Sequence, residues 1–250
     1  MSTYASFQGG VFLGKRDIDG LPIEVRSPGN VAELKLSLKT DVLEHYESQT
    51  GQRSLDHRMV KQTSATVNLT IEEFTKENIA LALYGHHVTG STGTVTAETI
   101  GGAAPVVGDR YFFAHPKVSA LVVTDSAGTP ATLTAGTHYT ADTDFGALQF
   151  LDITGFTAPF KAAYSYGVAT EIGIFTQALP ERYLRLEGIN TAQGNAKVLV
   201  ELYRVAFDPL KEISFISDEY NKFELEGSLL ADTTKPFDAV LGQFGRIVQL

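Results

Sequence analysis

Two runs of strict alternation between apolar and polar residues constrain the fold of this chain more than any other feature of its sequence. The runs span residues 31–40 and 65–72. Their apolar residues fall at every second position: Leu34, Leu36, Leu38, Val67, Leu69 and Ile71. Their polar residues occupy the positions between: Glu33, Lys35, Ser37, Lys39, Thr66, Asn68, Thr70 and Glu72. A period of two is the pattern of a strand with one buried face, so we predict two half-buried strands.

A long polar segment, residues 41–62, separates these two strands. It mixes acidic, basic and histidine side chains and has Gly51 near its middle. The segment is far longer than a hairpin turn needs, and long connections without secondary structure of their own are usually functional or ordered by a partner. We therefore predict a long loop that lies in solvent or contacts another subunit.

One helix is expected, at residues 75–84. Thr75 suits the N-cap position, and Glu77 lies in the first turn, where a negative charge is favoured. An Ala/Leu-rich run follows, and Gly85 is expected to supply the left-handed residue that ends the helix.

The composition changes after this helix, which indicates a domain boundary. Residues 86–108 are rich in Gly, Thr, Ser and Ala and indicate a connection or short edge strands. Five short strands are expected next, with a hairpin-like turn at 142–146 before the fourth: 110–114, 118–124, 137–140, 147–151 and 160–166. We predict an inserted small β domain at residues 89–169 within a core domain made of residues 1–88 and 170–250.

The core domain is expected to continue with further strands after the insertion. The segments with strand patterns are 171–176, 183–189, 196–206, 212–216 and 222–230. Residues 190–195, which include Gly194, are expected to form a turn. The C-terminal segment 237–250 is expected to be a last strand or an arm that reaches a neighbouring molecule.

Charge and composition exclude several classes of protein. The chain has 250 residues, with 20 lysines and arginines against 29 aspartates and glutamates, a net charge of −9. Such a chain is a poor candidate for gripping nucleic acid through phosphate contacts. It has no cysteine, which excludes disulfides and thiolate metal sites. No run approaches 18 apolar residues and residues 1–10 lack a signal-peptide pattern, so we expect no membrane partner and a chain kept in the cytoplasm until it assembles.

The sequence carries no constellation of residues that indicates catalysis. His86 and His87 are adjacent, so their side chains diverge and cannot chelate one ion. His45, Asp56 and His57 share one segment and could form an acid/base or metal cluster, but spacing alone does not bring them together. No nucleophile elbow, phosphate-binding loop or dinucleotide fingerprint occurs. We expect a protein without a catalytic site, metal or cofactor, which acts through its surfaces.

Five segments, taken in order, resemble the major tail tube proteins of tailed bacteriophages. They are the strand 32–39, a long loop with Tyr46-Glu47-Ser48 and residues 51–55, the strand 66–72, the helical run 76–85, and residues 213–227, which read ISFISDEYNKFELEG. The resemblance covers roughly residues 25–90 and 170–232. It rests on the order of these patterns and involves no catalytic signature.

The resemblance implies a structural virion protein with a tail-tube-type β-sandwich, one flanking α-helix and, in this chain, an inserted small β domain on the outer surface. Such proteins form hexameric rings that stack into the tail tube, the channel for DNA ejection into the host. The implied partners are further copies of the chain, a tape measure protein, and a tail sheath or terminator. The implied location is the virion tail, after synthesis in the host bacterial cytoplasm, and DNA is expected to pass without tight binding.

The resemblance also assigns two sets of candidate site residues. The loop between the first two long strands would contact the next ring, through Leu43, His45, Tyr46, Glu47, Arg53, Asp56, His57 and Arg58. The polar faces of the two alternating strands would line the channel, through Glu33, Lys35, Ser37, Lys39, Thr66, Asn68, Thr70 and Glu72. An acidic lumen would keep DNA from adhering to the wall, although two lysines interrupt that charge.

Three other interpretations of the function remain open. A ring-forming tail terminator or minor tail protein would assemble in the same way and stop at one ring. A surface carbohydrate-binding β module is suggested by aromatic residues of the expected insertion: Tyr111, Phe112, Phe113, Tyr139 and Phe145. An enzyme is the third reading, and it would need a cleft that no sequence motif indicates.

Overall fold

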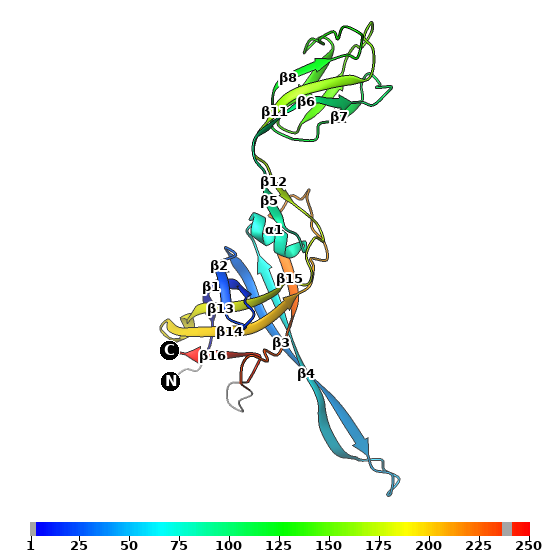
Figure 1. Cartoon of the computed structure of the whole chain (residues 1–250). Helices are drawn as coiled ribbons and strands as arrows, with labels where there is room; N and C mark the ends of the chain where they lie inside the picture. The colour runs from blue at the N-terminus through cyan, green and yellow to red at the C-terminus, as the bar shows by residue number, and fades with distance from the viewer. Residues whose placement is uncertain (1–3, 237–241) are drawn as a thin grey trace. The chain divides into compact units, whose positions relative to one another are not determined.

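The computed structural model describes residues 4–236 and 242–250 and shows a mainly β protein with antiparallel sheets (Figure 1). The chain divides into two compact units, one made of the residues up to His87 together with Ile172–Leu250, the other of Val88–Glu171. The sequence placed the insertion at residues 89–169. Each unit encloses a hydrophobic core of its own.

An eight-stranded antiparallel sheet forms the first unit. Seven strands follow one another in the order β2 (Pro22–Arg26), β1 (Phe7–Arg16), β13 (Glu181–Asn190), β14 (Ala196–Phe207), β15 (Phe223–Leu229), β4 (Leu55–Ile71) and β3 (Val31–Tyr46). The eighth, β16 (Gly245–Gln249), pairs with β14 beside this path. The C-terminal segment thus contains a last strand, while residues 237–241 lie outside the described part of the chain.

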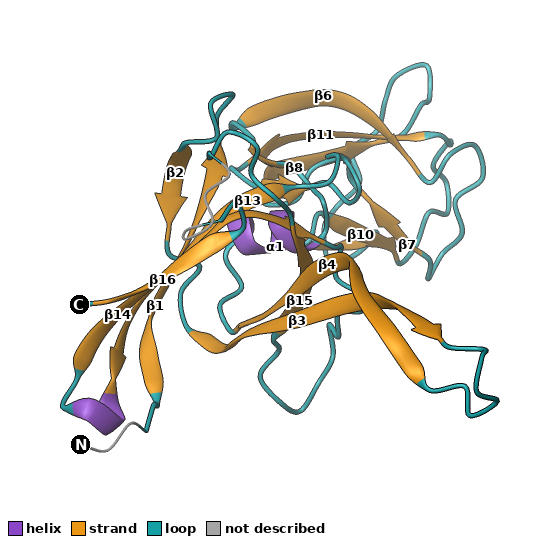
Figure 2. Ribbon diagram, turned by 90° about the horizontal axis from the view of Figure 1, so that it is seen from below, coloured by secondary structure: helices purple, strands orange, loops and turns teal. Residues whose placement is uncertain are grey.

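The sheet folds over a single core because β14 changes its partner along its length. Residues 198–202 of β14 pair with β16, and residues 205–207 pair with β15. Figure 2 shows the group of β1, β14 and β16 running in a different direction from β3, β4 and β15. Both groups contribute buried side chains to one cluster, among them Val11, Leu69, Leu184 and Phe223. The expected sandwich is therefore, in its hydrogen bonding, one continuous sheet that bends over its core.

The two alternating runs form strands as predicted. In the β3–β4 ladder Leu34 pairs with Leu69 and Lys35 pairs with Asn68, so apolar and polar residues lie on opposite faces. The apolar residues of the second run, Val67, Leu69 and Ile71, are fully buried, because they pack in one core with α1 and with residues of β1 and β13.

The prediction of a long loop at residues 41–62 is wrong. β3 continues to Tyr46 and β4 begins at Leu55, so only residues 47–54 connect the two strands. The extension has no core beneath it, and both of its faces are largely exposed. Burial of one face is what produces a period of two, so a ribbon exposed on both faces leaves no such signal.

Strands β1 and β2 were not predicted, and a strand predicted at 212–216 does not form. Glycines interrupt the apolar pattern of β1, and one of them is required by packing, since a Cβ on Gly9 would lie 2.2 Å from the carbonyl oxygen of Glu187. Residues 212–216 lie in an irregular segment, in which Phe215 and Ile216 are exposed. Residues 171–176 form a strand only at their beginning, in β12 (Thr170–Ile172).

The helix α1 (Lys76–Ala82) begins as predicted and ends differently. The Thr75 hydroxyl accepts the backbone N–H of Asn78 at 3.2 Å, which is N-cap geometry. At the other end the left-handed residue is Tyr84, with φ +51°, and the Gly85 N–H donates to the Ala80 carbonyl at 2.7 Å. Gly85 is needed for a close approach instead, since a Cβ there would lie 1.9 Å from the Gly173 carbonyl oxygen.

The second unit contains two three-stranded antiparallel sheets with one core between them. They are β7 (Arg110–Phe112), β10 (Ala147–Phe150) and β9 (Tyr139–Asp142), and β6 (Gly93–Ile100), β11 (Phe160–Tyr166) and β8 (Val118–Thr124). All five strands predicted for the insertion are present, and β6 lies in the segment expected to hold short edge strands. The two segments that connect the units pair as β5 (His87–Thr89) and β12.

Two leucines on the same face of the β3–β4 ladder provide a test of this register. Leu69 is 0% exposed and Leu38 is 79% exposed. Leu69→Ala should lower the free energy of unfolding by about 2–5 kcal/mol, because it removes a core side chain and leaves a cavity. Leu38→Ala should change it by less than about 0.5 kcal/mol. Urea denaturation of dilute monomer would measure both, and equal losses would contradict the register.

Candidate assembly surface

The ladder of β3 and β4 continues beyond the core as a two-stranded extension, residues 41–62, here called the arm. Asp41 pairs with Gln62, Leu43 with Met59, and Tyr46 with Leu55. In Figure 1 the arm projects away from the other strands of its unit. An isolated two-stranded ribbon is marginally stable in water, so the arm depends on the ladder that it continues.

The arm and its base expose apolar side chains on both faces. Leu36 and Leu38 continue the core face of β3 outward, and Val42 and Val60 pair beyond them. Leu43 and Met59 form an exposed pair on the opposite face. No other element of the described chain covers these residues, and apolar surface in water costs about 25 cal/mol per Å². Exposed apolar side chains that gather on one element are typical of protein contact sites.

Hydrogen bonds to one carboxylate order the turn at the tip of the arm. The Glu47 carboxylate accepts the backbone N–H groups of Gln49 and Thr50, at 2.7 and 3.0 Å, and the Thr50 hydroxyl. These donors, the hydroxyl foremost, lower the pKa of Glu47 from 4.5 to about 2. The turn is therefore fixed by an ionised side chain at neutral pH.

Charged and polar pairs cross the arm. His45 Nδ1 lies 2.6 Å from Asp56 Oδ1, and this hydrogen bond is the main cause that lowers the pKa of Asp56. His45 also stands opposite His57 in the ladder, while Arg58 lies 3.7 Å from Glu44. Within the described residues, no group of three histidine, aspartate or glutamate side chains has the geometry to hold a metal ion.

All the residues predicted for an inter-ring contact lie on the arm. Three are on β3, three are on β4 and two are in the connecting turn: Leu43, His45 and Tyr46; Asp56, His57 and Arg58; Glu47 and Arg53. The prediction of a loop was thus wrong about the secondary structure of these residues. They do lie together on one contiguous element, the arm. The prediction missed the exposed Leu38, Met59 and Val60, because exposure of an apolar residue cannot be seen in sequence.

The residues predicted to line a channel lie on one polar face of the sheet. Cross-strand pairing places Glu33 beside Thr70, Lys35 beside Asn68, and Ser37 beside Thr66. β15 adds a third row that was not included in the prediction: Glu224, Glu226 and Ser228. The alternation FELEGSL in β15 was a usable signal for that row. Lys39 continues the face toward the arm.

At the other end of this face, Glu72 is held in place by its neighbours. Its carboxylate accepts the side-chain amide of Asn30 at 2.5 Å and lies 3.3 Å from the Lys222 ammonium. The Asn30 hydrogen bond, followed by that of Lys222, lowers the pKa of Glu72.

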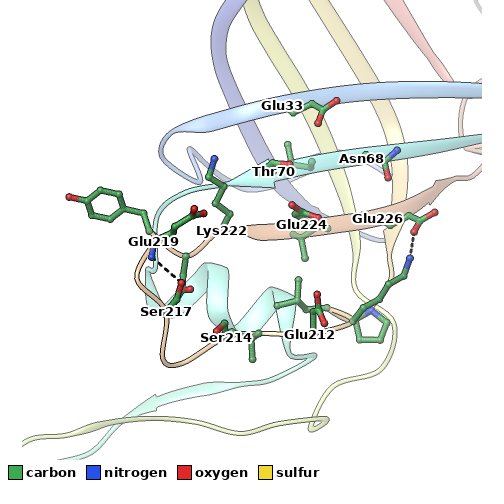
Figure 3. A pocket seen from close by; sticks show the side chains of 18 of the residues that line it. Glu33, Asn68, Thr70, Glu212, Ser214, Ser217, Glu219, Lys222, Glu224 and Glu226 are labelled. Carbon is green, nitrogen blue, oxygen red and sulfur yellow. Dashed lines mark hydrogen bonds and ion pairs between the residues drawn. The ribbon is translucent and has the colours of Figure 1, made fainter.

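An irregular segment, residues 209–222, lines an open groove together with this polar face. The groove has a volume of about 1140 Å³. Figure 3 shows Glu33, Thr70 and Glu224 on the strands, with Glu212 and Ser214 of the segment across from them. Lys211 bonds Glu226 at 2.7 Å from the segment to the sheet. This segment therefore covers part of the surface that was predicted to line the channel.

Taken together, the fold defines a mainly antiparallel β protein with a long edge strand, β3, and a polar arm that exposes several apolar side chains. The chain belongs to the family described as protein of unknown function UCP028589, whose family model matches residues 4–248. No curated protein matches the chain. Among the described residues, no helix is long and apolar enough to cross a membrane.

The tip of the arm provides a pH test. Because the pKa of Glu47 is lowered, its contribution to the turn is present above the ordinary value of 4.5 and is lost only as the pH falls through about 2. The amide NMR shifts of Gln49 and Thr50 should stay nearly constant from pH 6 down to about 3. A midpoint near 4.5 would contradict this geometry, and in Glu47→Gln the two amides should be displaced at all pH values.

Proposed function

We propose that the chain is a structural subunit that assembles with copies of itself into hexameric rings, stacked as the tail tube of a tailed bacteriophage. DNA would pass through the channel of this tube into the host. The observation that carries the proposal is the arm, an ordered ribbon with exposed apolar residues on both faces. An element of this kind fits a protein that is completed by its neighbours.

The position of β3 supports ring formation. β3 is 16 residues long and lies at one end of the strand order, with β2 at the other end. The outer edge of such a strand has N–H and C=O groups without ladder partners, and long exposed edges invite pairing with another chain. Pairing between neighbouring subunits around a closed ring would remove those edges.

The polar face of β3, β4 and β15 supports a channel wall that DNA does not bind tightly. Its rows combine carboxylates with hydroxyl and amide groups, and Lys35, Lys39 and Lys222 lie among them. The chain as a whole carries a net charge of −9. Phosphate binding depends mainly on cationic side chains, so such a wall would not bind duplex DNA tightly.

A carbohydrate-binding role for the second unit is the second candidate, favoured by one feature of β7. Phe112 is exposed and lies on the same face as Arg110, whose guanidinium is 2.8 Å from the Asp142 carboxylate. An aromatic side chain beside fixed polar groups is a common arrangement in ligand sites. Retention of the monomer on a glycan column would favour this candidate over the tube.

Electron microscopy of the concentrated protein tests the proposed function. Negatively stained wild-type protein should form hollow tubes with a regular axial repeat. Leu43→Asp combined with Met59→Asp places two charges on one face of the arm, and it should abolish tubes while leaving rings or folded monomers. Protein that stays monomeric at every concentration would contradict the proposal, and rings that never stack would favour a tail terminator.

Deletion of the second unit tests its place in the assembly. The chain enters and leaves this unit on paired strands, and the Gly90 N–H donates to the Ala169 carbonyl at 2.9 Å, so a two-residue Gly linker can join residues 90 and 169. If the unit decorates the outer surface, the shortened chain should still form tubes of the same axial repeat. Loss of rings would show that the unit takes part in ring formation.

A further inference from the structure

A second exposed apolar surface of the first unit lies in the loop 173–179, which follows β12. Ile174, Phe175 and Leu179 all have exposed side chains, and Phe175 is 70% exposed. Apolar residues that are scattered singly on a surface need no explanation, but here three of them are exposed within six residues of one loop. The proposed tube assigns no role to this loop.

The loop is held rigidly because it satisfies the C-terminal end of α1. The last carbonyls of a helix have no partner within the helix. Here the Leu83 carbonyl accepts the N–H of Phe175 at 3.0 Å, and the Tyr84 carbonyl accepts the N–H groups of Thr176 and Gln177, both at 2.8 Å. His86 adds a return bond from its N–H to the Thr176 hydroxyl at 2.9 Å.

The backbone of Phe175 is in an unfavourable conformation. Its φ is +55°, in the left-handed region that bulky side chains rarely adopt. Such a conformation persists where the surrounding structure imposes it and is frequent at functional sites. Its ring lies edge to face with that of Tyr84, with centroids 6.4 Å apart, and the residue is still 70% exposed, so the strain does not serve to bury the side chain. The arrangement instead presents a fixed aromatic side chain to solvent.

We propose that the loop 173–179 is the docking site for the arm of a second copy of this chain. The inference rests on the proposed stacking of rings and names the surface that receives the arm. The loop adjoins α1, and Figure 1 places α1 and the tip of the arm at opposite ends of the first unit. Two copies arranged head to tail would bring loop and arm together, and a contact of this kind repeats from copy to copy.

The two surfaces are complementary in chemistry. On one face of its ribbon the arm offers the cross-strand pair of Val42 and Val60, and Leu38 lies on the same face at the base, beyond the Thr40–Thr63 pair. The loop offers an aromatic anchor held in place before binding, which lowers the entropy lost on association. Rigid aromatic anchors that are buried on binding are the usual hot spots of protein interfaces.

Phe175→Gly separates a contact role from a structural role. Glycine adopts a φ of +55° without strain, so the monomer should keep its stability or gain some. Loss of the ring should raise the protein concentration needed for assembly by about tenfold or more. Asn195→Gly is the matched control, because Asn195 is also exposed and has a φ of +63° but carries no apolar ring. It should leave assembly unchanged.

Disulfide trapping tests the contact directly, because the chain contains no cysteine of its own. Val60→Cys protein, with the cysteine at an exposed site on the arm, is mixed with Phe175→Cys protein and oxidised, and covalent dimers are resolved on a non-reducing gel. The mixture should give dimers that neither variant gives alone. Ile18→Cys, at a site 96% exposed on the β1–β2 turn, replaces Phe175→Cys in the control mixture and should give none.

Electron microscopy of the same samples distinguishes the two proposals. Dimers between Val60→Cys and Phe175→Cys support the contact. If these dimers form but no tube does, the contact stands and the tube is overturned. Tubes without these dimers, or tubes that form equally well with Phe175→Gly, overturn the contact and leave the tube standing. Monomers without dimers overturn both.

Discussion

The antiparallel ladder between β3 and β4 is the interaction on which the rest of the structure depends. Its inner half contributes Leu34, Val67, Leu69 and Ile71 to the core, and α1, β15 and β1 pack around that core. Its outer half has no core and is ordered through continuity with the inner half. One pair of strands therefore fixes the fold and also carries the exposed surface that we assign to assembly.

The C-terminal end of α1 organises a second part of the unit in a different way. Its carbonyls accept N–H groups from Leu210 and from the loop after β12, two segments distant in sequence. The buried Asn78 ties the same helix to the carbonyl of Pro28 and to the guanidinium of Arg26. Buried polar groups require partners, so this short helix fixes the backbone of each segment that satisfies it.

The family to which the chain belongs is described without a function, so its physical features carry the functional argument. A long edge strand, an arm with exposed apolar side chains and the hydrogen-bonded loop 173–179 each leave surface that the isolated chain does not bury. The open groove gathers carboxylates and lysines, among which Lys211 pairs with Glu226, and Lys222 pairs with Glu72 at the end of the polar face.

The sequence by itself determined the elements whose burial differs between two faces or whose signals are local. These are the alternating strands around Leu36 and Leu69, the Thr75 N-cap, the turn at Gly194 and the strands of the second unit. Only the tertiary structure decided the arm, because both of its faces are exposed, and β1, because Gly9 packs through its backbone. It also decided how α1 ends: Tyr84 takes the left-handed conformation, and glycine is required at position 85 by the close approach of Gly173. Periodicity reports burial on one face, and contacts between distant segments leave no trace in it.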